Sequence, residues 1–200
     1  NPIIIPNTIS IDSSEFSYPG KKIFRSIDQK YGLEYTYAFW LNINNVKLTL
    51  GNVFVKGMKS GTTPTSACYD KYTIQGPGVW VRKEGDQAQL VIATNTYTPD
   101  CSSLSYQTME NCPPKYCSWS DSKCIQTGSL SKESLNIDNI PIGKWTHITF
   151  SVMNKRMDVY LNGELYSQKK FIGVPKQNNN DLIIGSSTNG CNPLNGFISG

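Results

Sequence analysis

The chain has 200 residues, of which 38% are hydrophobic and 17% are charged. This length favours a single compact domain, 1–200, and so low a charged fraction argues against a disordered chain or a coiled coil. The net charge of +4 is spread along the sequence, which argues against nucleic acid as a partner. No apolar run approaches the roughly 18 residues of a membrane helix, so membrane attachment requires an anchor outside this chain.

Period-two alternation of apolar and polar residues recurs along the chain, whereas helical periodicity is almost absent. It predicts a first strand over 35–43, where Tyr35, Phe39 and Ile43 share one face, and a second over 48–55. The apolar segments 79–81 and 90–92 flank a polar turn at 83–86 and therefore predict a hairpin.

The same alternation returns after residue 145. Ile148, Phe150 and Val152 share one face of the segment that Trp145 opens, and the pattern continues over 157–161. Asn162-Gly163 is then suited to a type I′ turn, and a return strand follows at Leu165-Tyr166. With short strands at 182–184 and 197–198, eight to twelve strands fit an all-β, antiparallel jelly-roll sandwich.

Cysteine is concentrated in one irregular segment, a disulfide-rich insertion at about 98–128. Such a segment cannot be held by burial alone, so three intramolecular disulfides are predicted, at least one of them inside 101–124. Zinc is the rival, but the spacings lack a two-residue knuckle and His147 is the only histidine. Six cysteines allow fifteen disulfide pairings, and the sequence does not choose between them. The six cysteines are Cys68, Cys101, Cys112, Cys117, Cys124 and Cys191.

Two segments of the predicted sandwich carry a family pattern. The runs Gly143–Phe150 and Met157–Leu165 resemble the Trp-x-His…Tyr-x-Asn-Gly core of laminin-G-like, concanavalin A-like domains, and 35–42 and 53–57 resemble that family's early strands. The resemblance covers roughly 8–200, apart from the insertion. It implies a concanavalin A-like/laminin-G-like sandwich, with Trp145 buried at the start of its strand.

Three shorter segments narrow the resemblance to one subgroup of this family. Segments 77–80, 137–141 and 173–178 are similar to the version of this domain encoded by large DNA viruses of algae and protists, where it commonly follows a membrane anchor. This likeness implies a location on a virion surface or outside a cell. The native polypeptide is then expected to extend beyond both ends of this chain, with a strand after Gly200 and an anchor before Asn1.

Catalytic residues are not predicted. Glucanases of this fold use carboxylates at i, i+2 and i+4 of one strand, but Glu84 and Asp86 are followed by Ala88 and sit in a turn. His147 with Asp158 as its orienting partner is the other candidate pair, and it lacks a nucleophile motif. We therefore expect no enzyme and no cofactor.

Calcium is the one metal left open, because laminin-G-like domains often hold it at a rim of the sandwich. The spacing of the aspartates does not define a calcium site. We therefore interpret these aspartates as solvent-exposed carboxylates on loops. The candidates are Asp70, Asp86, Asp100, Asp121 and Asp181.

Aromatic residues in or beside the cysteine segment are the candidate binding residues. They are suited to stacking on a sugar or anchoring a protein contact, or else to forming a small core against the disulfides. They are Tyr97, Tyr106, Tyr116 and Trp119. The predicted function is a non-enzymatic display or structural domain that engages other virion or surface proteins, or glycans, through its loops. The alternative is a secreted or surface lectin, a carbohydrate-binding module.

Overall fold

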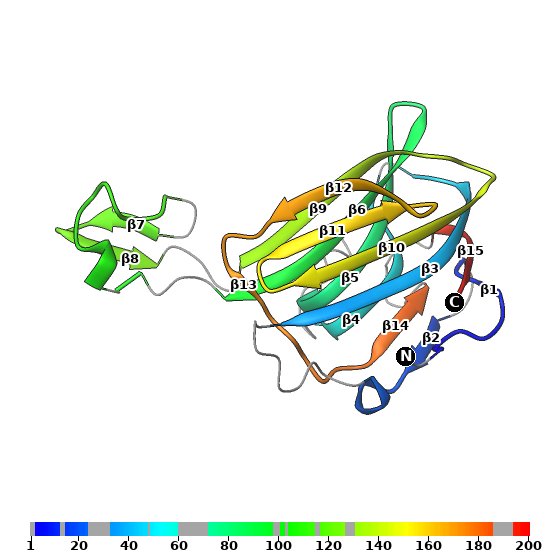
Figure 1. Ribbon diagram of the computed structural model, residues 1–200, viewed down its shortest axis with the longest axis horizontal. Helices are drawn as coiled ribbons and strands as arrows, with labels where there is room; N and C mark the ends of the chain where they lie inside the picture. Colours follow the sequence, from blue (N-terminus) through cyan, green and yellow to red (C-terminus); the bar gives the residue numbers. More distant parts are fainter. Residues whose placement is uncertain are drawn as a thin grey trace.

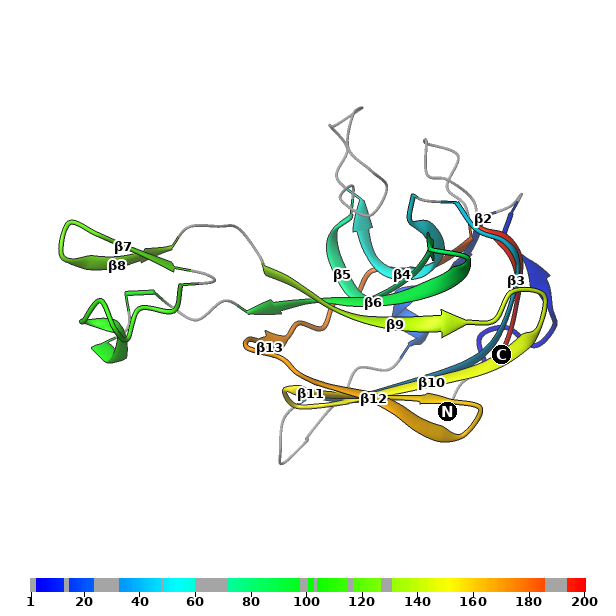
Figure 2. The ribbon, with the colours of Figure 1, turned by 90° about the horizontal axis from the view of Figure 1, so that it is seen from above.

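Two antiparallel sheets face each other in the computed structural model, and Figure 2 shows them edge-on as two layers. Nearly all regular structure is strand, and the described residues form no α-helix. The structure describes residues 3–12, 15–23, 33–47, 49–59, 72–97, 101–102, 104–114, 117–126, 131–185 and 194–200.

One layer is a six-stranded sheet in the order β1-β15-β3-β10-β11-β12. Its strands are β1 (Ile9–Ser10), β15 (Asn195–Ser199), β3 (Glu34–Asn45), β10 (Trp145–Met153), β11 (Arg156–Leu161) and β12 (Glu164–Lys170). β15 lies between β1 and β3, so it is paired on both sides and is not an edge strand.

The other layer contains β13, β6, β5, β4, β14 and β2 in that order, and β9 also pairs with β6. These strands are β2 (Glu15–Tyr18), β4 (Gly51–Lys59), β5 (Tyr72–Glu84), β6 (Gln87–Tyr97), β9 (Ser131–Ile140), β13 (Val174–Pro175) and β14 (Leu182–Gly185). A 3₁₀ turn, η1 (Gly20–Lys22), follows β2.

The core lies between the layers and is built by alternation, as predicted. Phe39 of β3 pairs with Ile148 of β10, and both side chains are buried. Tyr37 stacks on Phe54 of the opposite sheet and on Phe150, with ring centroids 5.7 and 5.5 Å apart. Aromatic contacts across the interface add to the free energy gained from apolar burial.

The hairpin turns also lie where the sequence predicts them. Asn162 and Gly163, between β11 and β12, have φ angles of 51° and 89°, the two positive values that a type I′ turn needs. Gly85 has a φ angle of 59° and begins the two-residue turn that joins β5 to β6. The predicted hairpins at these two places are therefore confirmed.

The expected burial of Trp145 is wrong, because 43% of its surface is exposed. Trp145 shares the strand face of His147 and Thr149, while Thr146 and Ile148 turn inward. Strand alternation therefore places the indole on the outer face of the six-stranded sheet.

A buried carboxylate joins β9 to the segment after β12. Glu133 is 2% exposed and accepts hydrogen bonds from the Thr96 hydroxyl (3.0 Å) and from the backbone N–H groups of Ile172 and Gly173 (3.2 and 3.0 Å). A Cβ at Gly173 would lie 2.3 Å from the carbonyl oxygen of Tyr97, so only glycine allows this close approach.

Candidate binding sites

The cysteine segment forms a small unit between β6 and β9. Its strands β7 (Cys117–Ser120) and β8 (Lys123–Gln126) pair as a hairpin, next to the 3₁₀ turn η2 (Leu104–Tyr106). The disulfides Cys101–Cys117 and Cys112–Cys124 both close inside the unit. Figures 1 and 2 show this unit, which we call the cysteine module, projecting from one end of the sandwich. Cys68 and Cys191 lie outside the described residues.

The three predicted aromatic residues that the structure describes, Tyr97, Tyr106 and Trp119, do not gather into one surface. Tyr106 and Trp119 pack against the four buried half-cystines, which is the small-core arrangement. Tyr97 ends β6 and is 56% exposed, with the Lys176 ammonium 5.6 Å from its ring centroid. Tyr116 lies outside the described residues.

The module nevertheless exposes apolar surface. Leu104 is 83% exposed, Met109 is 70% exposed and Ile125 is 46% exposed. Exposed apolar side chains are typical of a contact surface when they form a contiguous patch.

The carboxylates that resemble a glucanase pair lie on a turn. Glu84 ends β5 and Asp86 lies in the turn that follows, and both are exposed. A retaining or inverting mechanism ordinarily needs two carboxyl groups that flank the scissile bond of a bound sugar.

His147 and Asp158 are not brought together as a catalytic pair. The His147 ring lies against the Trp40 ring, with centroids 5.0 Å apart. Asp158 instead accepts hydrogen bonds from Arg156 (2.8 and 3.0 Å from Nε) and from Gln168 (2.9 Å). The Arg156 guanidinium, followed by Gln168, holds the pKa of Asp158 below its usual value, although partial burial opposes this.

The three calcium candidates that the structure describes lie far apart in the fold, on separate turns and loops. Asp86 and Asp121 lie on exposed hairpin turns, and Asp181 accepts a hydrogen bond from the N–H of Gly20 at 2.9 Å. Asp70 and Asp100 lie outside the described residues. Over the described residues, the only three metal-binding side chains within 4.8 Å of one another are cysteines already paired in disulfides.

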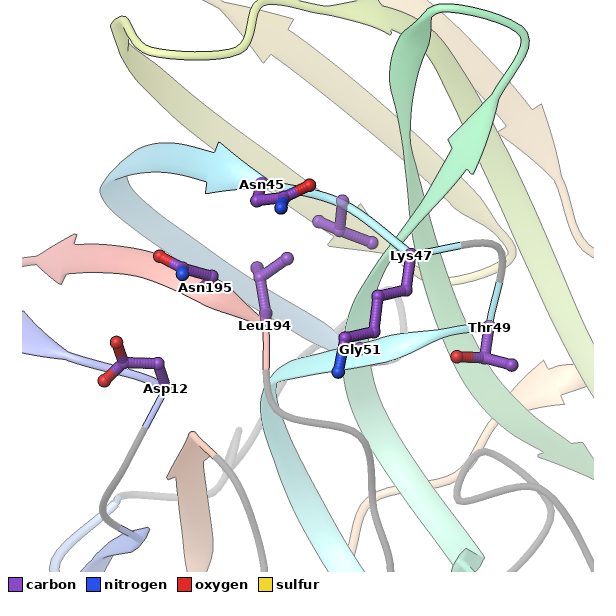
Figure 3. A pocket seen from close by; sticks show the side chains of 8 residues that line it. Asp12, Asn45, Lys47, Thr49, Gly51, Leu194 and Asn195 are labelled. Atoms are coloured by element: carbon purple, nitrogen blue, oxygen red, sulfur yellow. The ribbon is translucent and has the colours of Figure 1, made fainter.

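A pocket of about 150 Å³ opens at the rim of the sandwich, where β1, β15 and β3 meet the start of β4 (Figure 3). Asp12 and Asn195 lie on one side of it, and Lys47 and Thr49 lie on the other. We call it the rim pocket; it is lined by Asp12, Asn45, Lys47, Thr49, Gly51, Val81, Leu194 and Asn195.

Backbone pairing brings these residues together. The N–H of Ile11 donates to the carbonyl of Gly196 at 3.0 Å and so holds the adjoining Asp12 beside β15. Asn195 pairs with Asn45 across β15 and β3, and the N–H of Lys83 donates to the carbonyl of Lys47 at 2.8 Å.

The chemistry of the rim pocket is mixed. Val81 and Leu194 are almost fully buried and give it an apolar wall, whereas its mouth carries a carboxylate, an ammonium group, amides and a hydroxyl. Pockets for drug-sized ligands are larger, at roughly 300–1,000 Å³, so this one suits a small group with an apolar face and several hydroxyls.

Sequence reasoning missed the rim pocket. Its residues come from four separate segments, and none of them forms a motif by itself. The asparagines at the end of β3 were the available signal, because amide groups are among the polar groups that orient ligands in pockets.

The described part of the chain contains no helix long and apolar enough to cross a membrane.

Residues 121–200 match the model of the concanavalin A-like lectin/glucanases superfamily. The chain is also similar to the binding domain of botulinum neurotoxin serotype D, with 13% identity and a TM-score of 0.51 over 96% of this chain and 38% of that one. A tryptophan-to-alanine mutant of HCR/D shows 11% identity and a TM-score of 0.52 over 96% of this chain and 36% of that one.

The chain thus spans less than two fifths of these two structures. Curated protein sequences gave no significant match. At such low identities the structural likeness concerns the fold, which is the predicted antiparallel sandwich of the concanavalin A-like, laminin-G-like class.

Proposed function

We propose that this chain is a non-catalytic, extracellular binding domain that takes one sugar residue of a glycan into the rim pocket. The rim pocket is the observation that carries the proposal. The hydroxyl groups of a sugar both donate and accept hydrogen bonds, so they match the Asp12 carboxylate, the Lys47 ammonium group and the Asn195 amide. The buried Leu194 and Val81 side chains suit the C–H face of the same ring.

Two further observations support binding rather than catalysis. The serotype D neurotoxin domain, which shares the fold, is itself a binding domain. Of the described residues that line the rim pocket, Asp12 alone carries a carboxylate, whereas glycoside hydrolysis ordinarily uses two.

A glycan array probed with the labelled domain tests the proposal, followed by calorimetry with the sugars that bind. Asp12→Asn removes the charged acceptor, and Asp86→Asn on the β5–β6 turn is the matched control. A hydrogen bond to a charged group contributes about 1.5–3 kcal/mol, so Asp12→Asn should weaken binding by roughly 10- to 100-fold. An empty array, or equal affinity of Asp12→Asn and the control, would contradict the proposed function.

Display on a virion or membrane surface is part of the proposal. Disulfides persist in oxidising surroundings, and the cysteine module depends on two of them. We propose one domain with the module inserted at about 98–128, attached by an anchor outside this chain. Protease treatment of intact particles or cells tests this, because a displayed domain should be released or cleaved without lysis.

Protein contact through the cysteine module is a second candidate function. The exposed Leu104 and Met109 side chains favour it. A photoreactive amino acid placed at residue 104 should crosslink one defined neighbour on the native surface, and the same probe at the exposed Lys170 should not.

A further inference from the structure

Large aromatic side chains are exposed together on the outer face of the six-stranded sheet. Trp40 is 44% exposed, Trp145 is 43% exposed and Phe197 is 37% exposed. Together with His147, which lies against Trp40, they form what we call the aromatic patch. Grouped exposure of this kind on a folded domain is typical of an interaction site.

The strand register shows that the patch is continuous. Asn42 of β3 pairs with Phe197 of β15 on one side and with Trp145 of β10 on the other. In the next row, Trp40 pairs directly with His147. Directly opposed side chains lie about 4.5–5.5 Å apart at Cβ, so the rings occupy two adjacent rows on three strands.

The neighbours of the patch are polar but largely uncharged. Asn42 lies inside it and Ser199 pairs with Trp40 at its border. In the Arg156–Asp158 ion pair, Asp158 is opposite Ser151, four residues along β10 from His147, or about 14 Å, and Arg156 is opposite Met153, farther still. Lys144, which precedes Trp145, is the nearest charge along that strand.

The patch is joined to the rim pocket along β3. The Asn44 amide donates to Oδ1 of Asn195 at 3.2 Å, and Asn195 lines the pocket. From Asn45 at the pocket to Trp40 in the patch is five residues of one strand, or about 17 Å.

One polar atom of the patch lacks a partner among the residues that the structure describes. Oδ1 of Asn42 is buried and accepts no hydrogen bond from any of them. Buried polar atoms are nearly always paired, so an unpaired acceptor between two exposed rings points to a donor supplied from outside.

We propose that the aromatic patch extends the rim pocket into one elongated site for a neutral oligosaccharide. The terminal sugar occupies the rim pocket, and the following sugars lie across Phe197, Trp145 and Trp40. Sugar rings stack their C–H faces on flat aromatic side chains, while their hydroxyl groups bond to amides at the edges. The scarcity of charge in the patch favours a neutral chain over an anionic one. This inference rests on the proposed function.

Calorimetry and tryptophan fluorescence with maltohexaose, cellohexaose, mannohexaose and xylohexaose test it, beside glucose, mannose and xylose. At least one hexasaccharide should bind 10-fold or more tightly than its own monosaccharide. Trp40→Ala and Trp145→Ala should each abolish that advantage and leave monosaccharide affinity unchanged. Tyr97→Ala, an exposed aromatic residue on the other sheet, is the matched control and should keep it. Trp40→Phe and Trp145→Phe should keep most of the advantage, and they replace any alanine variant that fails to fold.

Three results would overturn the inference. If no hexasaccharide binds, or if hexasaccharides bind no better than monosaccharides, the patch is not part of a sugar site. If hexasaccharides bind no better than monosaccharides, the proposed function still stands. If the glycan array shows no binding at all, both the proposed function and this inference are wrong. A dimer in sedimentation equilibrium that Trp145→Ala dissociates would assign the patch to self-association.

Discussion

Removing the Glu133 carboxylate is expected to be among the most damaging single changes outside the apolar core. The side chain is buried and bridges β9, β6 and the segment that leads into β13. Its donors are the Thr96 hydroxyl and the N–H groups of Ile172 and Gly173.

The structure sets the size of the effect. In Glu133→Ala the Thr96 hydroxyl and the N–H of Gly173 lose a buried acceptor, and the N–H of Ile172 loses a part-buried one. Each unsatisfied buried group costs about 1–3 kcal/mol. Relief from burying a carboxylate offsets part of this sum, so we expect the free energy of unfolding to fall by about 3–5 kcal/mol. Glu133→Gln keeps one acceptor oxygen but turns an amide NH₂ toward the N–H of Ile172. It should cost about 1–2 kcal/mol.

Urea unfolding followed by circular dichroism measures both variants. Hydrogen exchange adds a local readout, since the amides of Ile172 and Gly173 should lose protection in Glu133→Ala. The reasoning is refuted if the free energy of unfolding of Glu133→Ala lies within about 0.5 kcal/mol of the wild-type value, which is about a twofold change in the equilibrium constant. It is also refuted if the glutamine variant is less stable than the alanine variant.

Three other changes have defined outcomes. Trp145→Ala should lower the free energy of unfolding by less than about 1 kcal/mol, whereas Trp80→Ala, which empties a fully buried site, should lower it by about 3–5 kcal/mol in the same urea assay. Replacing the Cys112–Cys124 pair by serine opens a 12-residue loop that is worth about 3 kcal/mol. Limited proteolysis should then cut the cysteine module while the sandwich survives, and equal cleavage of both would contradict this. Asp158 has a lowered pKa when folded, so its contribution to stability is present above the unfolded value of about 3.9 and is lost as the pH falls through the folded value. Asp158→Asn should flatten this acid limb of the stability profile, and an unchanged limb would show that the Arg156 pairing contributes nothing.

Long strands were predictable because each carries enough residues for a period-two pattern. The predicted segments at 35–43 and 145–152 lie within β3 and β10, and Asn162-Gly163 forms the expected turn. The eight to twelve strands expected fall short of the fifteen in the described residues. The shortest, such as β1 and β13, have two residues each and show no periodicity.

Trp145 shows where the family resemblance gave a wrong expectation. It implied a buried indole, whereas in the structure Trp145 lies with His147 and Thr149 on the outer face of β10. Successive strand residues point to opposite faces of the sheet, so the burial of Thr146 and Ile148 places Trp145 outside.

By itself, then, the sequence determined the all-β class, the long strands, their inward faces and the location of the disulfide segment, because each depends on residues close together in the chain. Only the tertiary structure decided the rim pocket, which joins Asp12 to Lys47 and Leu194, and the aromatic patch, which joins Trp40 to Trp145 and Phe197. Both surfaces arise from the pairing of β3 with β10 and β15. Strand partners are chosen by packing between residues more than a hundred positions apart, and no local pattern records that choice.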